Sequence, residues 1–507
     1  MLRLIVALIA AGLSVAASAA TDGSWQAVET EHFVIYSKSP PSRVTKLATD
    51  VESFDKLMRM ACGLGDDKDI VKVRIYEVDG TGDIERALGV DNTGIAGFYD
   101  SNILGPYLVT PRKIDAEVFD FTPELVIHHE YAHHFMLQYF PAVYPDWYVE
   151  GFAELIGSSK WLDDGKIGYG MPAIHRGHEI ASDWVPLQEL LVKEKVSYLD
   201  TYGQGWALTH FFTFTPQRTK QFRAYLDALS SGKSMKEAAQ VFGDLNNLNR
   251  EARRYVTGGS FNYRPVKVDI DQPVIRKTRL LSAAEATLIP EVIAFRDDAL
   301  DTYRRAGDRE RQRKLREANL GRIRKKAQLY PDDAYALYFL AEAENAAGNY
   351  AQSQAAIDRL LSIQPNHVRA MARKSMLMSR QAATLQGPQR TAAVADARNL
   401  AIKANKIDAI DPLPLLAYYE SYRQIGGKVP EQAVMGLMQV VSTLPRDDGL
   451  RLQLVDQLES DGRYAEAIAW IMSVANSPHE SPQRTAAREK LERLRQALAL
   501  RQSRPAG

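Results

Sequence analysis

The sequence has little cysteine and no surplus of charge of either sign. Cys62 is the only cysteine among 507 residues, which excludes an intramolecular disulfide and a cysteine-based metal cluster. Lys and Arg together number 63, as do Asp and Glu, so the chain lacks the basic surplus of proteins that mainly bind nucleic acid or anionic membranes. We therefore expect no nucleic-acid partner. Histidine is also scarce, at 10 residues, yet His128, His129, His133 and His134 fall within one short segment.

Long hydrophobic runs are absent from the sequence after its N-terminus. Residues 1–19 combine a basic start, an apolar run and the small residues Ala17-Ser18-Ala19, a pattern typical of a cleaved secretory signal peptide. The alternative is an uncleaved membrane anchor, because the apolar run approaches the shortest length, about 17 residues, that spans a bilayer. We expect cleavage, a protein exported to the periplasm or secreted, and no stable membrane insertion once the signal is removed.

The segments after the signal predict a mixed α+β domain over residues 20–260. From Thr122, which we expect to cap a helix that begins at Pro123, the chain is mostly helical. A polar stretch of poor periodicity, residues 261–290, is expected to be a connector packed on this domain. Before Thr122, strand-like stretches lie at 32–37, 71–78, 94–99 and 107–110, and a helical apolar stripe runs from Arg43 to Met60.

The C-terminal part, residues 291–507, contains a repeating pattern. Gly348-Asn349-Tyr350 and Gly462-Arg463-Tyr464 each lead into an alanine-rich helix, so a unit is predicted to be helix, glycine turn, helix and proline stop. The period resembles that of the tetratricopeptide repeat, which implies an all-α superhelix whose concave surface binds a partner. The prolines that set the period are 33 or 34 residues apart, except for one interval of 47, and are Pro331, Pro365, Pro412, Pro445 and Pro478.

The histidine cluster contains an HExxH motif, His129-Glu130-Tyr131-Ala132-His133. On a helix, positions i and i+4 share one face, so both imidazoles can reach the same metal ion. Glu130 lies beside them and can take a proton from a water molecule that the metal activates. The motif therefore predicts a Zn2+ site with Glu130 as general base, whereas His128 and His134 have no assigned role.

A catalytic zinc ion has three protein ligands and one open position, so a third ligand is expected on the next helix. The segment from Pro145 to Glu154 offers two candidates, Glu150 and Glu154, which are one turn apart. Here the sequence resembles the gluzincin peptidases, in particular their peptidase-MA-like branch, whose members are often described only as a domain of unknown function. The resemblance implies a zincin-like fold, gives the third ligand role to Glu150 and places Glu154 behind a ligand histidine. Glu154 is the alternative ligand.

The same resemblance implies two further parts of an active site. A Tyr-x-x-x-Trp element that begins at Tyr202 is expected to supply a donor for the oxyanion that develops in the transition state, with His210 as the alternative. The edge strand of the sheet, which we place at 94–99, is expected to bind an extended peptide, and Gly97 and Phe98 are its candidate substrate-binding residues.

These features favour an exported zinc metallopeptidase that hydrolyses peptide bonds and whose repeat domain recruits a substrate or a partner protein. The alternative is a catalytically silent scaffold, stabilised by the metal, whose repeats bind partner proteins. A third hypothesis is the hydrolysis of a non-peptide amide, such as a cell-wall link. The sequence retains every expected ligand and the base, which favours an enzyme. His175 and His178, in a glycine-rich region, are expected to lie in a surface loop.

Overall fold

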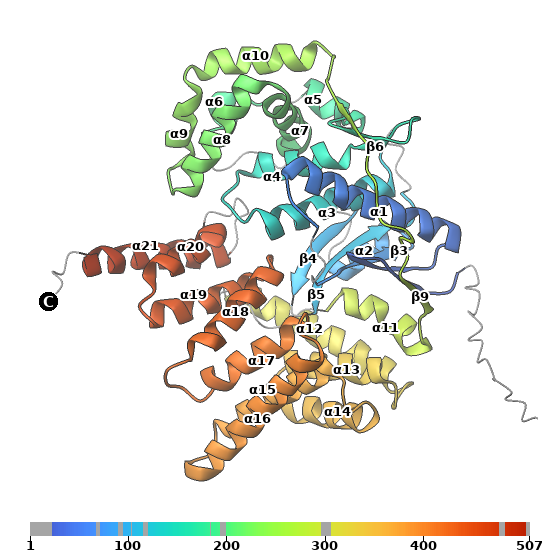
Figure 1. The fold of residues 1–507 in the computed structure, drawn as a ribbon, viewed down its shortest axis with the longest axis vertical. Coiled ribbons are helices and arrows are strands. Elements are labelled where there is room, and N and C mark those ends of the chain that lie inside the picture. Colours follow the sequence, from blue (N-terminus) through green and yellow to red (C-terminus); the bar gives the residue numbers. More distant parts are fainter. Residues whose placement is uncertain are drawn as a thin grey trace, which may run out of the picture.

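The chain forms a mixed sheet flanked by helices, followed by an array of helices (Figure 1). The computed structural model describes residues 23–66, 71–89, 95–102, 104–114, 120–182, 184–192, 199–295, 306–475 and 482–502. The expected signal at 1–19 and Gly94 of the expected edge strand lie outside the described residues. Within the described ranges, no helix is both long and apolar enough to cross a membrane.

The main sheet has six strands in the order β4-β5-β3-β2-β1-β9. The central strands β2, β3 and β5 are parallel, whereas β4, β1 and β9 run antiparallel to their neighbours, so β4 and β9 form the two edges. The strands are β1 (Gln26–Glu29), β2 (Phe33–Ser37), β3 (Val73–Val78), β4 (Phe98–Asn102), β5 (Gly105–Pro111) and β9 (Lys277–Leu280).

One face of the sheet is covered by α1 (Pro41–Cys62), α3 (Pro123–Tyr139) and α4 (Asp146–Gly157). Side chains alternate along each strand, so one set of residues reaches this face and the next set reaches the other. Phe33, Ile35 and Leu108 belong to the core beneath α1 and α3, whereas Tyr76 and Val109 belong to the core on the opposite face. Both faces of the sheet are therefore buried.

The opposite face is covered by α2 (Thr81–Leu88) and by helices from the beginning of the C-terminal part. Tyr76, Tyr107 and Val109 share one hydrophobic core with Leu288 of α11 (Ala283–Ile293) and Leu337 of α13 (Ala334–Ala346). The sheet and the first repeat helices are thus joined by a common core rather than by a loose linker.

Residues 261–290, expected to be a connector, contribute one strand to the six-stranded sheet and one strand to a second sheet of three strands. β8 (Arg264–Val266) pairs with β7 (Ile167–Tyr169), β9 pairs with β1, and α11 begins at Ala283. The sequence of β9, Lys-Thr-Arg-Leu, has no apolar alternation that could indicate a strand. All four of its residues are exposed in the structure.

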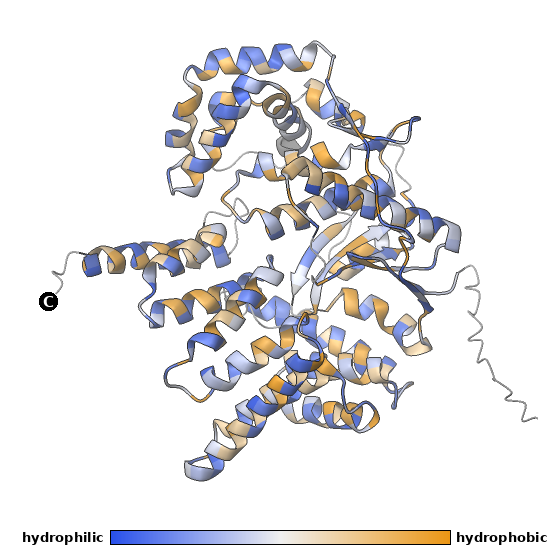
Figure 2. Ribbon diagram, viewed as in Figure 1, coloured by the Kyte–Doolittle hydropathy of each residue, from blue (hydrophilic) through white to orange (hydrophobic). Residues whose placement is uncertain are grey.

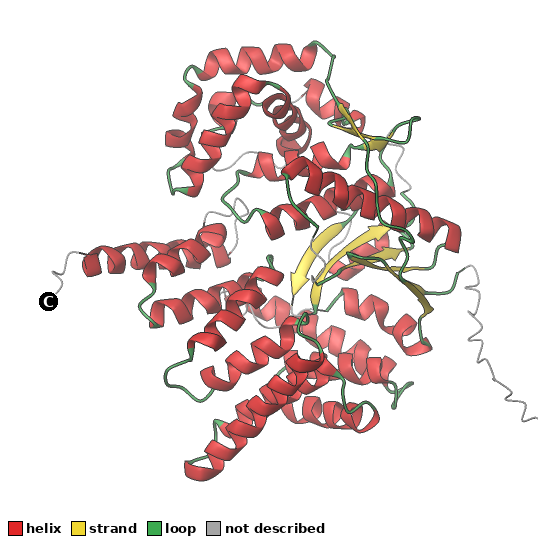
Figure 3. Cartoon of the chain, in the orientation of Figure 1, coloured by secondary structure: helices red, strands yellow, loops and turns green. Residues whose placement is uncertain are grey.

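The remainder of the first part is mostly helical, and Figure 3 shows its small second sheet beside those helices. That sheet has the order β6-β7-β8. Its elements are β6 (Lys160–Trp161), β7 (Ile167–Tyr169), two 3-10 turns (Ile174–Arg176 and Ala239–Phe242), α5 (Gly177–Ser182), α6 (Leu187–Leu190), α7 (Leu199–Phe214), α8 (Pro216–Ser230), α9 (Met235–Ala238) and α10 (Leu245–Thr257).

The C-terminal part is a series of helix pairs, as the period predicts. Gly348 and Gly462 have positive φ angles of 80° and 69° in the turns between paired helices, where glycine is favoured. Polar and apolar residues share each helix, in keeping with helices that bury one side (Figure 2). The helices after α13 are α14 (Tyr350–Ile363), α15 (Val368–Ala382), α16 (Gly387–Ile407), α17 (Pro412–Arg423), α18 (Glu431–Thr443), α19 (Asp448–Ser460), α20 (Tyr464–Ala475) and α21 (Pro482–Gln502), and α12 (Ala306–Ala327) precedes them.

Candidate metal centre

The two motif histidines lie one turn apart on the buried face of α3. Thr122 caps this helix, because its hydroxyl oxygen accepts a hydrogen bond from the Leu125 amide at 3.2 Å, and Pro123 takes the first helical position. The Nε2 atoms of His129 and His133 are 3.1 Å apart, and both residues are buried. The two imidazoles therefore converge on one point, as the spacing predicts.

The third donor comes from α4, which packs against α3. Glu150 Oε2 lies 3.3 Å from His129 Nε2 and 3.6 Å from His133 Nε2, and it is a buried oxygen without a hydrogen-bond partner. Two ligands of a tetrahedral zinc ion, with bonds of about 2.1 Å, are separated by roughly 3.4 Å. The triangle of donor atoms has edges of this length, so the three residues fit a zinc ion.

The charges around these donors favour a cation. Burial alone lowers the pKa of His129, but Glu150 and Glu154 outweigh it and raise the pKa to about 9. Burial raises the pKa of Glu150, yet His133 and His129 hold it well below its usual range. A buried carboxylate beside two imidazoles is a donor set that binds either protons or a metal ion, so the two compete for the site.

Glu154 lies behind the triangle. Its Oε1 atom is 3.4 Å from Nδ1 of His129, on the side of that ring away from Glu150. An acceptor at Nδ1 favours the tautomer whose Nε2 lone pair is free for a metal. Both Glu154 oxygens have other partners, since His175 Nε2 lies 2.8 Å from Oε2 and Arg176 donates to Oε1 at 2.8 Å. The structure therefore brings Glu150, and not the alternative Glu154, to the two Nε2 atoms.

His175 and Arg176 were not recognised from the sequence as part of this site. His175 was expected in a surface loop, but its side chain is only 2% exposed because it packs against Glu154. That expectation was wrong. Burial raises the pKa of Glu154, but Arg176, His175 and His129 lower it to about 2, so the carboxylate stays charged. His178, in contrast, is exposed as expected.

Glu130, the expected base, is half-buried and lies next to the backbone before β4. A Cβ atom on Gly97 would lie 3.4 Å from Glu130 Cγ and 2.4 Å from Val126 Cγ1. Only glycine allows the chain to pass so close to α3. Gly97 and the neighbouring Phe98 are thereby held beside Glu130, and the strand proper begins at Phe98 rather than at residue 94.

Tyr202, the expected oxyanion donor, lies in the first half of α7 (Leu199–Phe214). Its ring is 6.0 Å from the ring of His129 at an interplanar angle of 23°, and the Arg176 guanidinium lies 4.5 Å from its centroid. A close approach of α4 and α7 brings it there, because a Cβ atom on Gly151 would lie 2.3 Å from the carbonyl oxygen of Gly205. Tyr202 therefore adjoins the metal centre.

His210, the alternative to Tyr202, is engaged elsewhere. It is fully buried, with Nδ1 2.8 Å from the Tyr255 hydroxyl oxygen and Nε2 3.0 Å from the Gly170 carbonyl oxygen. Burial lowers the pKa of His210 to about 4. The residue joins α7 to α10 and to the end of β7, so the geometry does not place it in the centre.

His128 and His134, which had no assigned role, attach α3 to its neighbours. His128 Nε2 is 2.7 Å from Asp50 Oδ2, and its ring stacks on Phe54 of α1 at 3.9 Å. His134 Nδ1 is 3.0 Å from the hydroxyl oxygen of Tyr99 in β4. Burial lowers the pKa of His134 to about 3, so it is neutral. The two histidines beside the ligands thus fix the position of the helix that carries them.

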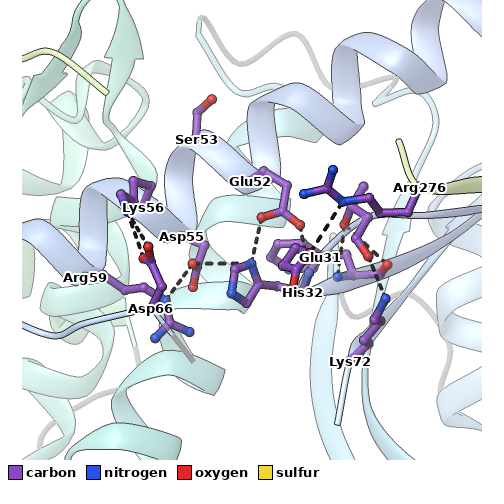
Figure 4. Close-up of polar contacts among 12 residues, drawn as sticks. Glu31, His32, Glu52, Ser53, Asp55, Lys56, Arg59, Asp66, Lys72 and Arg276 are labelled. Atoms are coloured by element: carbon purple, nitrogen blue, oxygen red, sulfur yellow. Dashed lines mark hydrogen bonds and ion pairs between the residues drawn. The ribbon is translucent and has the colours of Figure 1, made fainter. Parts of the chain in front are cut away.

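A second cluster, His32, Glu52 and Asp55, also brings potential metal donors together (Figure 4). Its convergent donor atoms already have partners, unlike the Glu150 oxygen, although Nε2 of His32 is buried without one. His32 Nδ1 is 2.7 Å from Glu52 Oε2, Arg59 donates to Asp55 Oδ2 at 2.7 Å, and the Tyr131 hydroxyl donates to Asp55 Oδ1 at 2.6 Å. This cluster is a buried polar network that joins α1, α3 and β2, and we assign no metal to it.

Comparisons with known proteins leave the family of the chain open. No protein-family model matches the sequence, and no curated protein matches it. Among solved structures, the chain is similar to a thermophilic tetratricopeptide-repeat (TPR) protein from Thermus thermophilus, with 19% identity and a TM-score of 0.32 over 38% of this chain and 98% of the other. Neither result assigns the chain to a family, so its function is inferred from the metal centre.

Proposed function

We propose that the protein is an exported zinc metallopeptidase with a zincin-like domain, and that His129, His133 and Glu150 hold the zinc ion. One observation carries this proposal. Glu150 Oε2 is buried without a hydrogen-bond partner and lies within 3.6 Å of two imidazole nitrogens. An unsatisfied buried carboxylate oxygen is costly, and a cation at the centre of the triangle removes that cost.

The donor set favours zinc in a catalytic role. Two imidazoles and one carboxylate, without a thiolate, are ligands that zinc accepts, and three protein ligands leave one position open. When bound, zinc supplies a Lewis acid that polarises a carbonyl oxygen and lowers the pKa of a coordinated water molecule to about 7.

The side chains around the triangle supply the general base, the oxyanion donor and the substrate-binding residues. Glu130 accepts the proton of the attacking water and passes it to the leaving amine. Tyr202 donates a hydrogen bond to the oxyanion that develops on the substrate. Gly97 and Phe98 bind the substrate in an extended conformation, because they lead into the edge strand β4 beside Glu130.

The repeats border the same edge of the sheet. The Arg446 amide, just before α19, donates to the Ser101 hydroxyl of β4 at 2.8 Å, and Arg369 of α15 donates to the Leu104 carbonyl at 2.8 Å. We propose that the repeat array binds the part of a protein substrate, or a partner protein, that extends beyond the cleaved bond. Export through a cleaved signal at 1–19 belongs to this proposal.

The proposal is tested by comparing the cleavage of exported proteins by the wild type and by Glu130→Gln at equal zinc content. We expect new N-termini with the wild type, and their loss with Glu130→Gln because the base is removed. Glu124→Gln, in the first turn of the same helix, is the matched control and should cleave as the wild type does. Equal cleavage by Glu130→Gln would contradict the mechanism. A zinc-loaded wild type without activity would favour the scaffold function instead.

A further inference from the structure

A large cavity lies between the ends of α1 and α3 and the helices α4, α7 and α8. Its volume is about 860 Å3, within the range of small-molecule sites. The walls are mainly apolar and aromatic, and they come from the end of α1, from α3, α4, α7 and α8, and from β7 and β8. Representative lining residues are Leu57, Met136, Phe152, Phe222 and Leu226. None of the three proposed zinc ligands lines it.

The charged lining residues all carry the same sign. Lys220, Arg223 and Arg264 line the cavity, all three are exposed, and no Asp or Glu lines it. Within the part of the chain that the structure describes, none of the three forms an ion pair with a carboxylate. Arg264 instead lies over the ring of Phe214 at 5.3 Å. A cavity with apolar walls and only cations is complementary to an apolar molecule that ends in an anion.

Three of the five hydroxyl groups of the lining donate to carbonyl oxygens of the protein, whereas the structure records no hydrogen bond for those of Tyr148 and Tyr169. Thr213 donates to the Thr209 carbonyl at 2.6 Å, Thr219 to the Phe212 carbonyl at 2.6 Å, and Tyr144 to the Phe140 carbonyl at 2.8 Å. A bound peptide would bring backbone amides and carbonyls that need partners in such a cavity. An acyl chain needs none, and two hydroxyl groups are too few to satisfy the backbone of a peptide, so the mainly apolar lining favours a lipid tail.

We propose that this cavity binds a long-chain fatty acid, with the acyl chain among the aromatic side chains and the carboxylate at Lys220, Arg223 and Arg264. The size agrees with this occupant. If one methylene takes about the volume of a water molecule, roughly 30 Å3, a chain of about 16 carbons takes on the order of 480 Å3. The cavity accommodates that chain and leaves room for the carboxylate at the mouth.

The reactivity of a cysteine in the lining reports whether the cavity is occupied. Cys62, the single cysteine of the sequence, lines the cavity, and burial raises the pKa of its thiol to about 11. The thiol therefore reacts slowly with thiol reagents in the free protein. A bound acyl chain covers it and slows the reaction further.

The experiment measures binding of cis-parinaric acid, a fluorescent fatty acid, to the purified protein, and its displacement by palmitate. We expect saturable binding of one molecule per chain, slower modification of Cys62 with palmitate present, and weaker displacement by shorter acids. Each buried methylene is worth up to about a fourfold change in Kd.

Two variants locate the site. Ala61→Phe adds a large side chain at an exposed lining position and should abolish binding and the protection of Cys62. Lys220→Glu combined with Arg223→Glu reverses two exposed charges and should weaken binding about tenfold. Lys403→Glu combined with Lys406→Glu, also exposed and three residues apart on α16, is the matched control and should leave Kd unchanged.

Several results would overturn the proposal. These are no palmitate binding by the wild type, a Kd that neither variant changes, and equal affinity for hexadecyltrimethylammonium, which has the same tail and a cationic head. Displacement of the probe by an acidic aromatic peptide but not by palmitate would show that the occupant is a peptide. The charge-reversal variant keeps the test valid even if Ala61→Phe fails to fold, because its two sites are exposed.

Discussion

The substitution Glu154→Gln separates the residue that positions the metal site from the residues that bind the metal. It keeps the shape of the side chain but removes a charge that is 99% buried, since Glu154 is 1% exposed. His129 Nδ1 then loses the carboxylate at 3.4 Å that favours its metal-binding tautomer. Arg176, whose side chain is 22% exposed, loses its most buried partner.

The magnitude follows from the pKa of Glu154, which is lowered from 4.5 to about 2. A shift of this size corresponds to about 3 kcal/mol of stability in the metal-free chain. Because the pKa is depressed on folding, this stability is fully present above about pH 4.5 and is lost as the pH falls toward 2. Glu154→Gln should therefore cost about 3 kcal/mol at pH 7 and weaken zinc binding by roughly 10- to 100-fold.

Urea unfolding of the metal-free protein and zinc titration against a competing chelator measure the two effects. Glu179→Gln is the control, because Glu179 contacts the same arginine at 2.9 Å but its side chain is 28% exposed. We expect it to cost about 1 kcal/mol and to leave the zinc Kd unchanged. Equal zinc affinities for Glu154→Gln and Glu179→Gln would refute the positioning role of Glu154.

Three further predictions concern the surroundings of the centre. Gly97→Ala should destabilise the protein by about 1–3 kcal/mol in urea unfolding, because its Cβ would lie 2.4 Å from Val126 Cγ1, and Val126→Ala should suppress part of that loss in a double-mutant cycle. His210 has a pKa of about 4 in the folded protein and about 6.5 when unfolded, so its contribution to stability falls by about 2 kcal/mol between pH 7 and 5, and His210→Phe should lack this dependence. Tyr202→Phe should lower kcat at least about 100-fold in a peptidase assay while KM and zinc content stay within twofold.

The histidine donors could be predicted from the sequence because a local pattern carries them. His129 and His133 are one helical turn apart, so short-range periodicity is enough to bring them together. The same holds for Thr122 and Pro123 at the start of α3, and for the glycine turns of the repeats. Glu150, on the next helix, was one of two candidates for the third ligand, and the resemblance to the gluzincin peptidases gave it that role.

The residues that hold Glu154 and α3 in place could not be predicted, because their partners are distant in sequence. His175 and Arg176 follow Glu154 by 21 and 22 residues, in a segment without helical or strand periodicity. His128 and His134 contact Asp50 and Tyr99, on α1 and β4, through side chains alone. No pattern within the sequence indicates such pairs.

The packing of the repeat helices on the sheet could not be predicted from the sequence either. Strands β3 and β5 are buried on both faces, but their sequences do not indicate which helices supply the cover. The helices that do so, α11 and α13, come more than 170 residues after the sheet's last central strand. The short exposed strand β9, which joins the two parts, has no apolar signal at all.

The number of zinc ions bound per chain after dialysis, measured by mass spectrometry of the metal, tests the central claim most directly. The wild type and Glu130→Gln should each retain one zinc ion, because Glu130 is not a ligand. Glu150→Gln should retain essentially none, whereas Glu52→Gln, in the second buried cluster, should retain one. Zinc that persists in Glu150→Gln, or that is lost from Glu52→Gln alone, would contradict the assignment of the metal centre.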